Sequence, residues 1–430
     1  MIMTAVTSAW RSRGFRRVWT AGAVSGLGAE IGELAVPVLA LVTLGASATE
    51  LSFVRAALLV PYLVLTLGLG VLVDRRRRRP LLVAADLGRG VLLGAVCTLA
   101  LLGWLTVPLL IAAAAALGSL TVLYLLAEFS FVPLVVEEEQ LIDANARITA
   151  AQSAIGVAGA GAGGALVQLL TAPFALVANA VGYLASGALI ASVKVDEPLP
   201  DRATRTSALR EARAGVAVIV RHRVLRGLVG EATLWNLGNE VFMLALSLLV
   251  LRLLDLGAGA LGLVLMAAGA GAFLGAALSR RLTERFGYGR SLIASMLVGN
   301  SAPLVASGSA LAVGAAGLPA LAIVATLTAG MLLSGIGCGV ANSQAVSLRQ
   351  LAVEPALRGR ANAAYRLVSW GALSIGALAG GALITLIGEW GAAVAGAGLM
   401  AAATLPVLLS PVRRLRTIEE VRPAAALRVG

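Results

Sequence analysis

Long apolar runs dominate the chain and are separated by short, mostly arginine-containing polar segments. A helix needs about 20 mainly apolar residues to cross a bilayer, whereas a barrel strand needs about ten residues of alternating polarity. The runs have the length of helices and do not alternate. We therefore predict an all-α membrane protein with twelve transmembrane helices, at residues 18–43, 51–73, 80–104, 107–135, 147–170, 174–193, 228–252, 257–279, 290–313, 318–345, 361–387 and 390–410.

Basic residues lie in every second connection between these helices. With twelve helices, all but four of the 34 lysines and arginines fall on one side of the membrane, and the exceptions are Arg55, Arg89, Arg252 and Arg366. The positive-inside rule makes that side cytoplasmic. We therefore expect a multi-pass protein of the cytoplasmic (inner) membrane with both termini in the cytoplasm.

The longest polar stretch divides the chain. Residues 194–227 contain two prolines and then a segment, 208–228, whose apolar residues recur on one helical face, which predicts an amphipathic helix along the inner membrane surface. We expect an N-terminal six-helix bundle at 1–193, a cytoplasmic linker at 194–227, a C-terminal six-helix bundle at 228–412 and a cytoplasmic tail at 413–430.

The two predicted bundles repeat each other in sequence. Residues 27–30 read LGAE and residues 237–240 read LGNE, while ANA stands at both 144–146 and 361–363 and GGAL follows each ANA at the same distance. Two parallel six-helix repeats are the architecture of major facilitator transporters.

Composition excludes several other classes of protein. Hydrophobic residues make up 59% of the chain and charged residues 13%, against about 45–50% and 25% in soluble proteins. The net charge of +12 follows from topology, so we expect no nucleic-acid partner. One histidine and two cysteines build neither a metal site nor a catalytic constellation, and Lys194, the only lysine, lies outside any phosphate-binding GxxxxGK motif. We expect no cofactor, no metal and no enzymatic activity.

A short motif after the second predicted helix resembles a known signature. Residues 70–79 read GVLVDRRRRR, which is similar to the major facilitator loop 2–3 pattern G-x-x-x-D-R-x-G-R-R. The match covers Gly70, Asp74, Arg75, Arg78 and Arg79, and an arginine replaces the second glycine.

Further segments resemble one subgroup of that superfamily. The segments are 15–19 (FRRVW), 86–89 (DLGR), 348–350 (LRQ) and 358–362 (RGRAN). Together they resemble the drug:proton antiporter subgroup that includes macrolide exporters and enterobactin exporters. The resemblance implies efflux driven by the proton gradient and leaves the substrate open. The chain departs from this pattern at Ala160, where antiporters often carry proline, and at Ala29, where the subgroup commonly has an acid.

Acidic residues inside the predicted helices are the first candidates for chemistry. Glu30, Glu33 and Glu240 lie about 18 Å along their helices, near the bilayer midplane, where an ionised acid costs about 2.5–3.5 kcal/mol. Burial favours the neutral form of a carboxyl group. We therefore predict that one or more of them exchanges a proton with the substrate, unless they remain neutral and only join helices. Glu128 is a weaker candidate, for lining a path for cationic drugs.

The loop 2–3 motif predicts a gate. Gly70 would allow a neighbouring helix to approach closely, and Asp74 would accept hydrogen bonds from arginines or a helix N-terminus in one conformer only. The alternative for the arginines is that they only enforce topology. Asp86 and Arg89 are spaced to pair, either structurally or within the gate. Arg366 is expected to reach the cytoplasmic surface or an acid on another helix.

These observations predict a secondary transporter that works by alternating access. The most direct function is proton-coupled efflux of a small apolar or amphipathic compound by a monomer in the bilayer. Neutral or cationic cargo is favoured because few arginines, mainly Arg89 and Arg366, are expected to face a cavity. The alternatives are a siderophore or lipid-like exporter and, from another class, a non-transporting scaffold or sensor.

Overall fold

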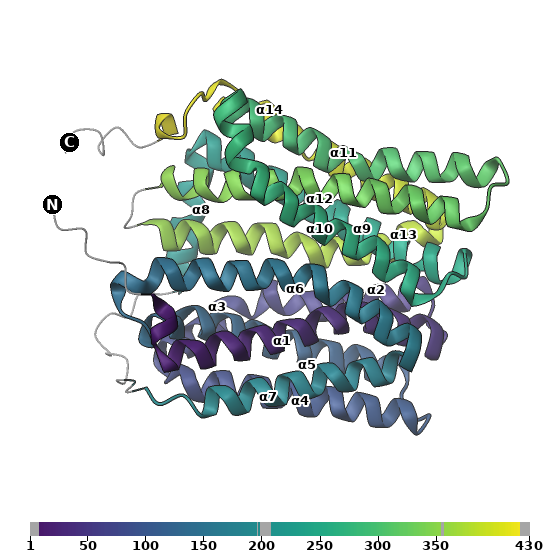
Figure 1. Ribbon diagram of the computed structural model, residues 1–430, viewed down its shortest axis with the longest axis horizontal. Helices are drawn as coiled ribbons and strands as arrows, with labels where there is room; N and C mark the ends of the chain where they lie inside the picture. Colours follow the sequence, from purple (N-terminus) through teal and green to yellow (C-terminus); the bar gives the residue numbers. More distant parts are fainter. Residues whose placement is uncertain (1–7, 196, 198–207, 354–356, 422–430) are drawn as a thin grey trace. The chain divides into compact units, whose positions relative to one another are not determined.

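The computed structural model describes residues 8–195, 197, 208–353 and 357–421, and within them the chain is helical without strands (Figure 1). Helices form because each satisfies its own backbone N–H and C=O groups, which lipid cannot do. The α-helices are α1 (Arg13–Val38), α2 (Ala48–Val64), α3 (Thr66–Arg75), α4 (Arg78–Leu101), α5 (Val107–Phe131), α6 (Leu141–Leu170), α7 (Ala172–Ala191), α8 (Ala208–Arg221), α9 (Arg223–Leu248), α10 (Gly257–Phe286), α11 (Tyr288–Ala315), α12 (Ala320–Leu351), α13 (Arg358–Ala402) and α14 (Leu405–Leu408).

Ten helical stretches in the described part of the chain are long and apolar enough to cross a membrane. The difference from the predicted twelve has two sources. The second predicted helix is divided at Leu65 into α2 and α3, one turn after Pro61, which lacks a backbone donor. The eleventh and twelfth both lie in α13, which breaks at Gly388 (φ 74°, ψ 174°), a conformation suited to glycine. The all-α fold with twelve predicted spans is therefore compatible with these helices.

The chain forms two compact units. Unit 1 comprises residues 1–45 and 60–205, and unit 2 comprises residues 46–59 and 206–430. The first residues of α2 thus belong to unit 2, although they lie early in the sequence. Parts of the predicted linker and tail fall outside the described residues. The predicted amphipathic helix ends at Arg221 as α8, which packs against α13 and buries Ile219.

The sequence repeat is matched by backbone irregularities. Each of α1 and α9 continues into a π-helical turn, η2 (Leu39–Thr43) and η5 (Leu249–Leu253). The two turns are separated by the same number of residues as Gly28 and Gly238. Thr171 and Gly388, both with φ near +75°, are separated like Asn145 and Asn362. The two halves therefore share backbone geometry as well as sequence.

Small residues set the distances between helices. In unit 2, α10 and α12 meet at Gly271, Gly275, Gly335 and Gly339, and a Cβ added at any of these would collide with the backbone of the facing helix. In unit 1, a Cβ added at Gly159 of α6 would instead collide with the side chain of Glu30 on α1. Close contact between backbones is how membrane helices associate where lipid leaves little hydrophobic drive.

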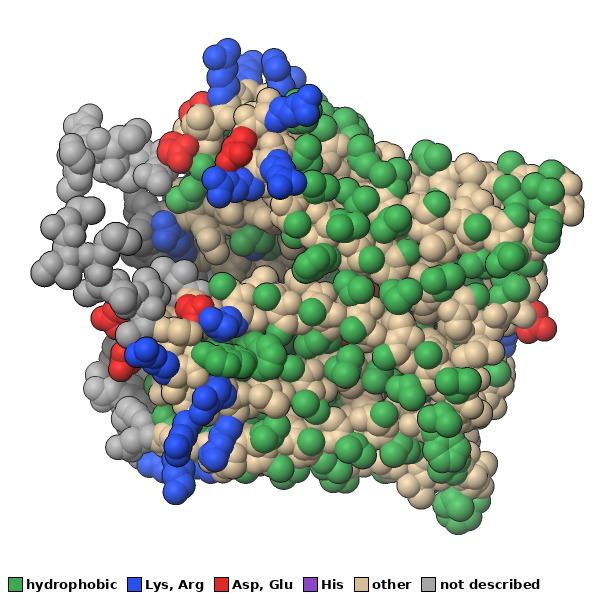
Figure 2. Space-filling view, in the orientation of Figure 1, with side chains coloured by type: hydrophobic (Ala, Val, Ile, Leu, Met, Phe, Trp, Pro, Cys, Tyr) green, Lys and Arg blue, Asp and Glu red, His purple; other side chains and the backbone are tan. Residues whose placement is uncertain are grey.

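Charged side chains are unevenly distributed on the surface. Figure 2 shows most of the visible lysines and arginines on the left side of the view, whereas apolar side chains are spread over the rest of the visible face. This distribution is the one that the positive-inside rule expects for a membrane protein.

Candidate functional site

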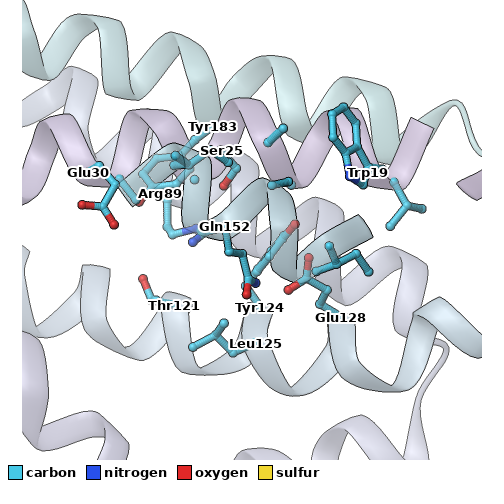
Figure 3. A pocket seen from close by; sticks show the side chains of 18 of the residues that line it. Trp19, Ser25, Glu30, Arg89, Thr121, Tyr124, Leu125, Glu128, Gln152 and Tyr183 are labelled. Atoms are coloured by element: carbon cyan, nitrogen blue, oxygen red, sulfur yellow. The ribbon is translucent and has the colours of Figure 1, made fainter. Parts of the chain in front are cut away.

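Unit 1 contains a cavity of about 290 Å³ that is lined mainly by α1, α4, α5, α6 and α7. Glu30 of α1, Arg89 of α4 and Glu128 of α5 line it, with the two carboxylates toward opposite sides of the view (Figure 3). Tyr62 of α2 and Tyr183 of α7 add aromatic surface. An apolar cavity with a few convergent polar groups is typical of small-molecule sites.

Arg89 is fixed in position by its surroundings. It is buried, pairs with Asp86 one turn earlier on α4, and its Cζ lies 4.3 Å and 4.2 Å from the ring centres of Tyr124 and Tyr183. Asp86 also accepts a hydrogen bond of 2.6 Å from Ser186 Oγ. The predicted pairing of Asp86 with Arg89 is therefore present, and its role in gating stays a prediction. Both aromatic rings hold the guanidinium by cation–π contact.

The acids of unit 1 differ in their surroundings. Glu30 and Glu128 are half-buried in the cavity, and within the described residues no lysine or arginine lies within 4 Å of either carboxylate. Glu30 packs its Cβ against Gly159. Glu33 is exposed and does not line this cavity. Glu30 and Glu128 thus line this cavity, and the predicted role of all three acids in proton exchange stays a prediction.

Unit 2 contains a second cavity, of about 540 Å³, lined mainly by α9, α11, α12 and α13. Glu231 of α9 faces it and accepts a hydrogen bond of 3.3 Å from Asn300. Two arginines also face it, Arg349 of α12 and Arg366 of α13. Arg366 thus reaches a cavity rather than an acid on another helix, since no carboxylate among the described residues lies within 4 Å.

The two cavities lie at equivalent places in the repeat. Gly26 and Asn236, which the first repeat aligns, line one cavity each, and so do Gln152 and Ser369, which the second repeat aligns. Their charges differ, because carboxylates predominate in the first and arginines in the second. Equivalent helix faces thus carry different chemistry.

Glu240 lies away from both cavities. It is buried in unit 2, and its carboxylate binds Arg55 of α2 at 3.0 Å, 3.1 Å and 3.4 Å. Close by in sequence, Arg252 donates a hydrogen bond of 2.7 Å to the carbonyl of Ala46. Arg55 therefore attaches α2 to α9, and Arg252 attaches the residues just before α2 to η5.

The loop 2–3 motif only partly fits its predicted role. Nothing among the described residues lies within 4 Å of a Cβ placed at Gly70, so the close helix approach at this glycine stays a prediction. The side chain of Asp74 lies outside what the structure describes, and Arg75, at the end of α3, is exposed. The gating role of Asp74 therefore stays a prediction.

Another acid occupies the N-terminus of α4. The carboxylate of Glu197 accepts hydrogen bonds from the backbone N–H groups of Arg78 and Arg79 and pairs with the Arg78 guanidinium at 3.6 Å. Glu197 is buried although it follows α7 in an irregular segment. A carboxylate here satisfies free amides and opposes the positive end of the helix dipole.

Sequence reasoning missed three of these residues. Glu197 gave no signal, because its contact joins segments far apart in sequence. Arg349 was assigned to a loop because the predicted helix ended at 345, whereas α12 continues to Leu351. Arg55 did carry a signal, since it is one of the four basic residues outside the predicted cytoplasmic connections.

Comparison with known proteins places the chain in a family. Residues 4–427 match the major facilitator family described as "Transmembrane secretion effector". The chain belongs to this family. It is 30% identical over 295 residues to "Uncharacterized MFS-type transporter y4rN" of Sinorhizobium fredii (strain NBRC 101917 / NGR234), a match that covers 67% of this chain but only 65% of that protein.

Solved major facilitator structures share the fold of this family member. The nucleoside transporter NupG is similar with a TM-score of 0.70 and 11% identity, over 92% of this chain and 98% of that one. A bacterial homologue of the iron transporter ferroportin, in an inward-facing state, is similar with a TM-score of 0.69 and 18% identity, over the same shares. At such identities the likeness concerns the fold alone.

Proposed function

We propose that the protein is a secondary transporter that exports small amphipathic compounds in exchange for protons, by alternating access across the cytoplasmic membrane. Membership of a major facilitator family supports transport. The unit 1 cavity, with two carboxylates that have no basic partner within 4 Å among the described residues, is the observation that carries the coupling.

Glu30 and Glu128 are the proposed coupling groups. A carboxylate in an apolar bundle is costly when ionised and unpaired, so each would bind a proton in the conformer that shields it from water and release that proton in the other. The aromatic walls offer contact surface to the apolar part of a solute. Arg89 would remain bound to Asp86 and position the rings of Tyr124 and Tyr183 rather than take up protons.

Transport by everted membrane vesicles tests the proposal. The probes are ethidium, Nile red and 1-anilinonaphthalene-8-sulfonate, which are cationic, neutral and anionic amphipathic fluorophores. We expect accumulation of at least one probe that needs the proton gradient and stops with a protonophore. Glu30→Gln or Glu128→Gln should lower gradient-driven transport by about tenfold or more, because the neutral side chain no longer changes charge.

Glu284→Gln is the matched control. This acid is largely exposed on α10 and, among the described residues, forms an ion pair only with Arg280 four residues away, so its loss should leave transport unchanged. Gradient-driven transport that survives in both cavity variants would refute the coupling role. No transport of any probe, with no change in drug susceptibility when the gene is removed, would favour a scaffold or sensor.

A further inference from the structure

The unit 2 cavity has an excess of positive charge. Arg349 and Arg366 line it together with one acid, Glu231, whose described partner is Asn300. Neither arginine has a carboxylate within 4 Å among the residues that the structure describes. Two guanidinium groups facing one cavity repel each other, and an anion between them would remove this repulsion.

The same cavity has an aromatic wall. The Cζ atom of Arg349 lies 3.9 Å from the ring centre of Tyr365, and that of Arg366 lies 5.1 Å from the ring centre of Trp370. Arginines that stack on rings present their N–H groups at the edge of the stack, where they can bind the two oxygens of one anionic group.

Trp235 supplies an additional donor. Its ring lines the cavity, and the only described group near its buried Nε1 is the thiol of Cys338, which is a weak acceptor. A buried donor of this kind is costly unless something else satisfies it. The cavity, about 540 Å³, is in the size range of sites for drug-sized molecules.

We propose that the unit 2 cavity binds an aromatic carboxylate, with its carboxylate group on Arg349 and Arg366 and its ring against Trp370 and Tyr365. This inference rests on the proposed transport function and specifies its cargo, because it gives the exported compound an acidic group. It also revises the expectation of neutral or cationic cargo, which counted only Arg89 and Arg366 among cavity arginines; Arg349 adds a second cation to this one cavity.

Equilibrium binding of 2-naphthoate to the purified protein in phosphatidylcholine nanodiscs tests the inference without requiring transport. Trp235 and Trp370 line the cavity, so quenching of tryptophan fluorescence reports occupancy. The neutral isostere 2-naphthamide should bind at least tenfold more weakly. Arg349→Gln and Arg366→Gln should each weaken naphthoate by about tenfold, because each removes a charge-assisted hydrogen-bond donor.

Matched variants guard against a folding defect. Arg285→Gln removes an arginine of α10 that does not line the cavity and should leave the affinity unchanged. Arg366→Lys keeps the charge and should bind better than Arg366→Gln. Equal affinity for naphthoate and naphthamide, or naphthoate binding unaffected in both glutamine variants, would overturn the inference.

Changing the lipid of the nanodisc distinguishes a free aromatic carboxylate in the cavity from an anionic lipid headgroup. We expect the same naphthoate affinity in phosphatidylcholine and in phosphatidylglycerol discs. Loss of binding only in phosphatidylglycerol would mean that an anionic lipid headgroup occupies the cavity, which overturns the aromatic carboxylate. Binding without transport would leave this inference standing and refute only the proposed function.

Discussion

Neutralising Glu240 should release the first part of α2 from unit 2. The Glu240→Gln substitution keeps the size of the side chain but removes the charge that binds Arg55 at 3.0–3.4 Å. The two side chains are only 7% and 12% exposed, so solvent screens the pair weakly. Since α2 begins in unit 2 and continues into unit 1, any motion that separates this segment from α9 must break the pair.

The size of the effect follows from this burial. Removing one partner of a buried ion pair costs about 3–5 kcal/mol, and a glutamine that retains an acceptor should lose less, about 1.5–3 kcal/mol for the charge-assisted bond. Because about 1.4 kcal/mol corresponds to tenfold in an equilibrium constant, the separated state of α2 should become roughly 10-fold to 100-fold more populated.

Cysteine labelling at position 52 measures this population. Ser52 is 2% exposed and lies against Gly381 of α13, where a Cβ would overlap its side chain. In a chain with Cys97→Ser and Cys338→Ser, the Ser52→Cys thiol should react with a maleimide only when α2 separates. Glu240→Gln should raise this rate by about tenfold or more.

Charge exchange supplies the control. The double variant Arg55→Glu with Glu240→Arg restores an ion pair of the same composition and should return the labelling rate toward that of the parent. Glu284→Gln, at an exposed pair on α10, should not change it. A labelling rate within twofold of the parent in Glu240→Gln would refute the reasoning.

Two further predictions concern stability. Glu197→Ala removes the carboxylate from the N-terminus of α4 and should destabilise the fold by about 1 kcal/mol. The midpoint of thermal unfolding in detergent should fall. An unchanged midpoint would argue against the contact. Gly275→Val should prevent the close packing of α10 on α12 and reduce the yield of folded protein in size-exclusion chromatography. Gly308→Val is the control and should be tolerated, because open space surrounds that glycine. Equal yields of the two variants would contradict the packing role.

Most of the fold was predictable because lipid leaves few alternatives to apolar helices. Helix ends were less predictable, and this mattered for function. The predicted helix at 318–345 stopped short of Arg349 because its last turns are polar, but α12 continues to Leu351 and carries that side chain into the cavity. The break at Leu65 was also missed, since the apolar pattern continues through it.

The candidate site was predictable in residue type but not in pairing. The four arginines outside the predicted cytoplasmic connections were an informative signal, because each has a defined environment in the structure. Arg89 and Arg366 face cavities. Arg55 and Arg252 bind Glu240 and the carbonyl of Ala46, which are both far away in the sequence. Charge in an apolar chain can be located by counting, whereas its partner depends on packing between distant segments.

The matched π-helical turns η2 and η5 have an evolutionary consequence. Irregular turns are rare in helices, so their presence at equivalent positions indicates that the chain arose by duplication of an ancestor that already had this bend. Immediately after such a duplication, the two halves would have carried identical cavities. Carboxylates in one half and arginines in the other are then products of later divergence, in which side chains changed and the backbone was inherited.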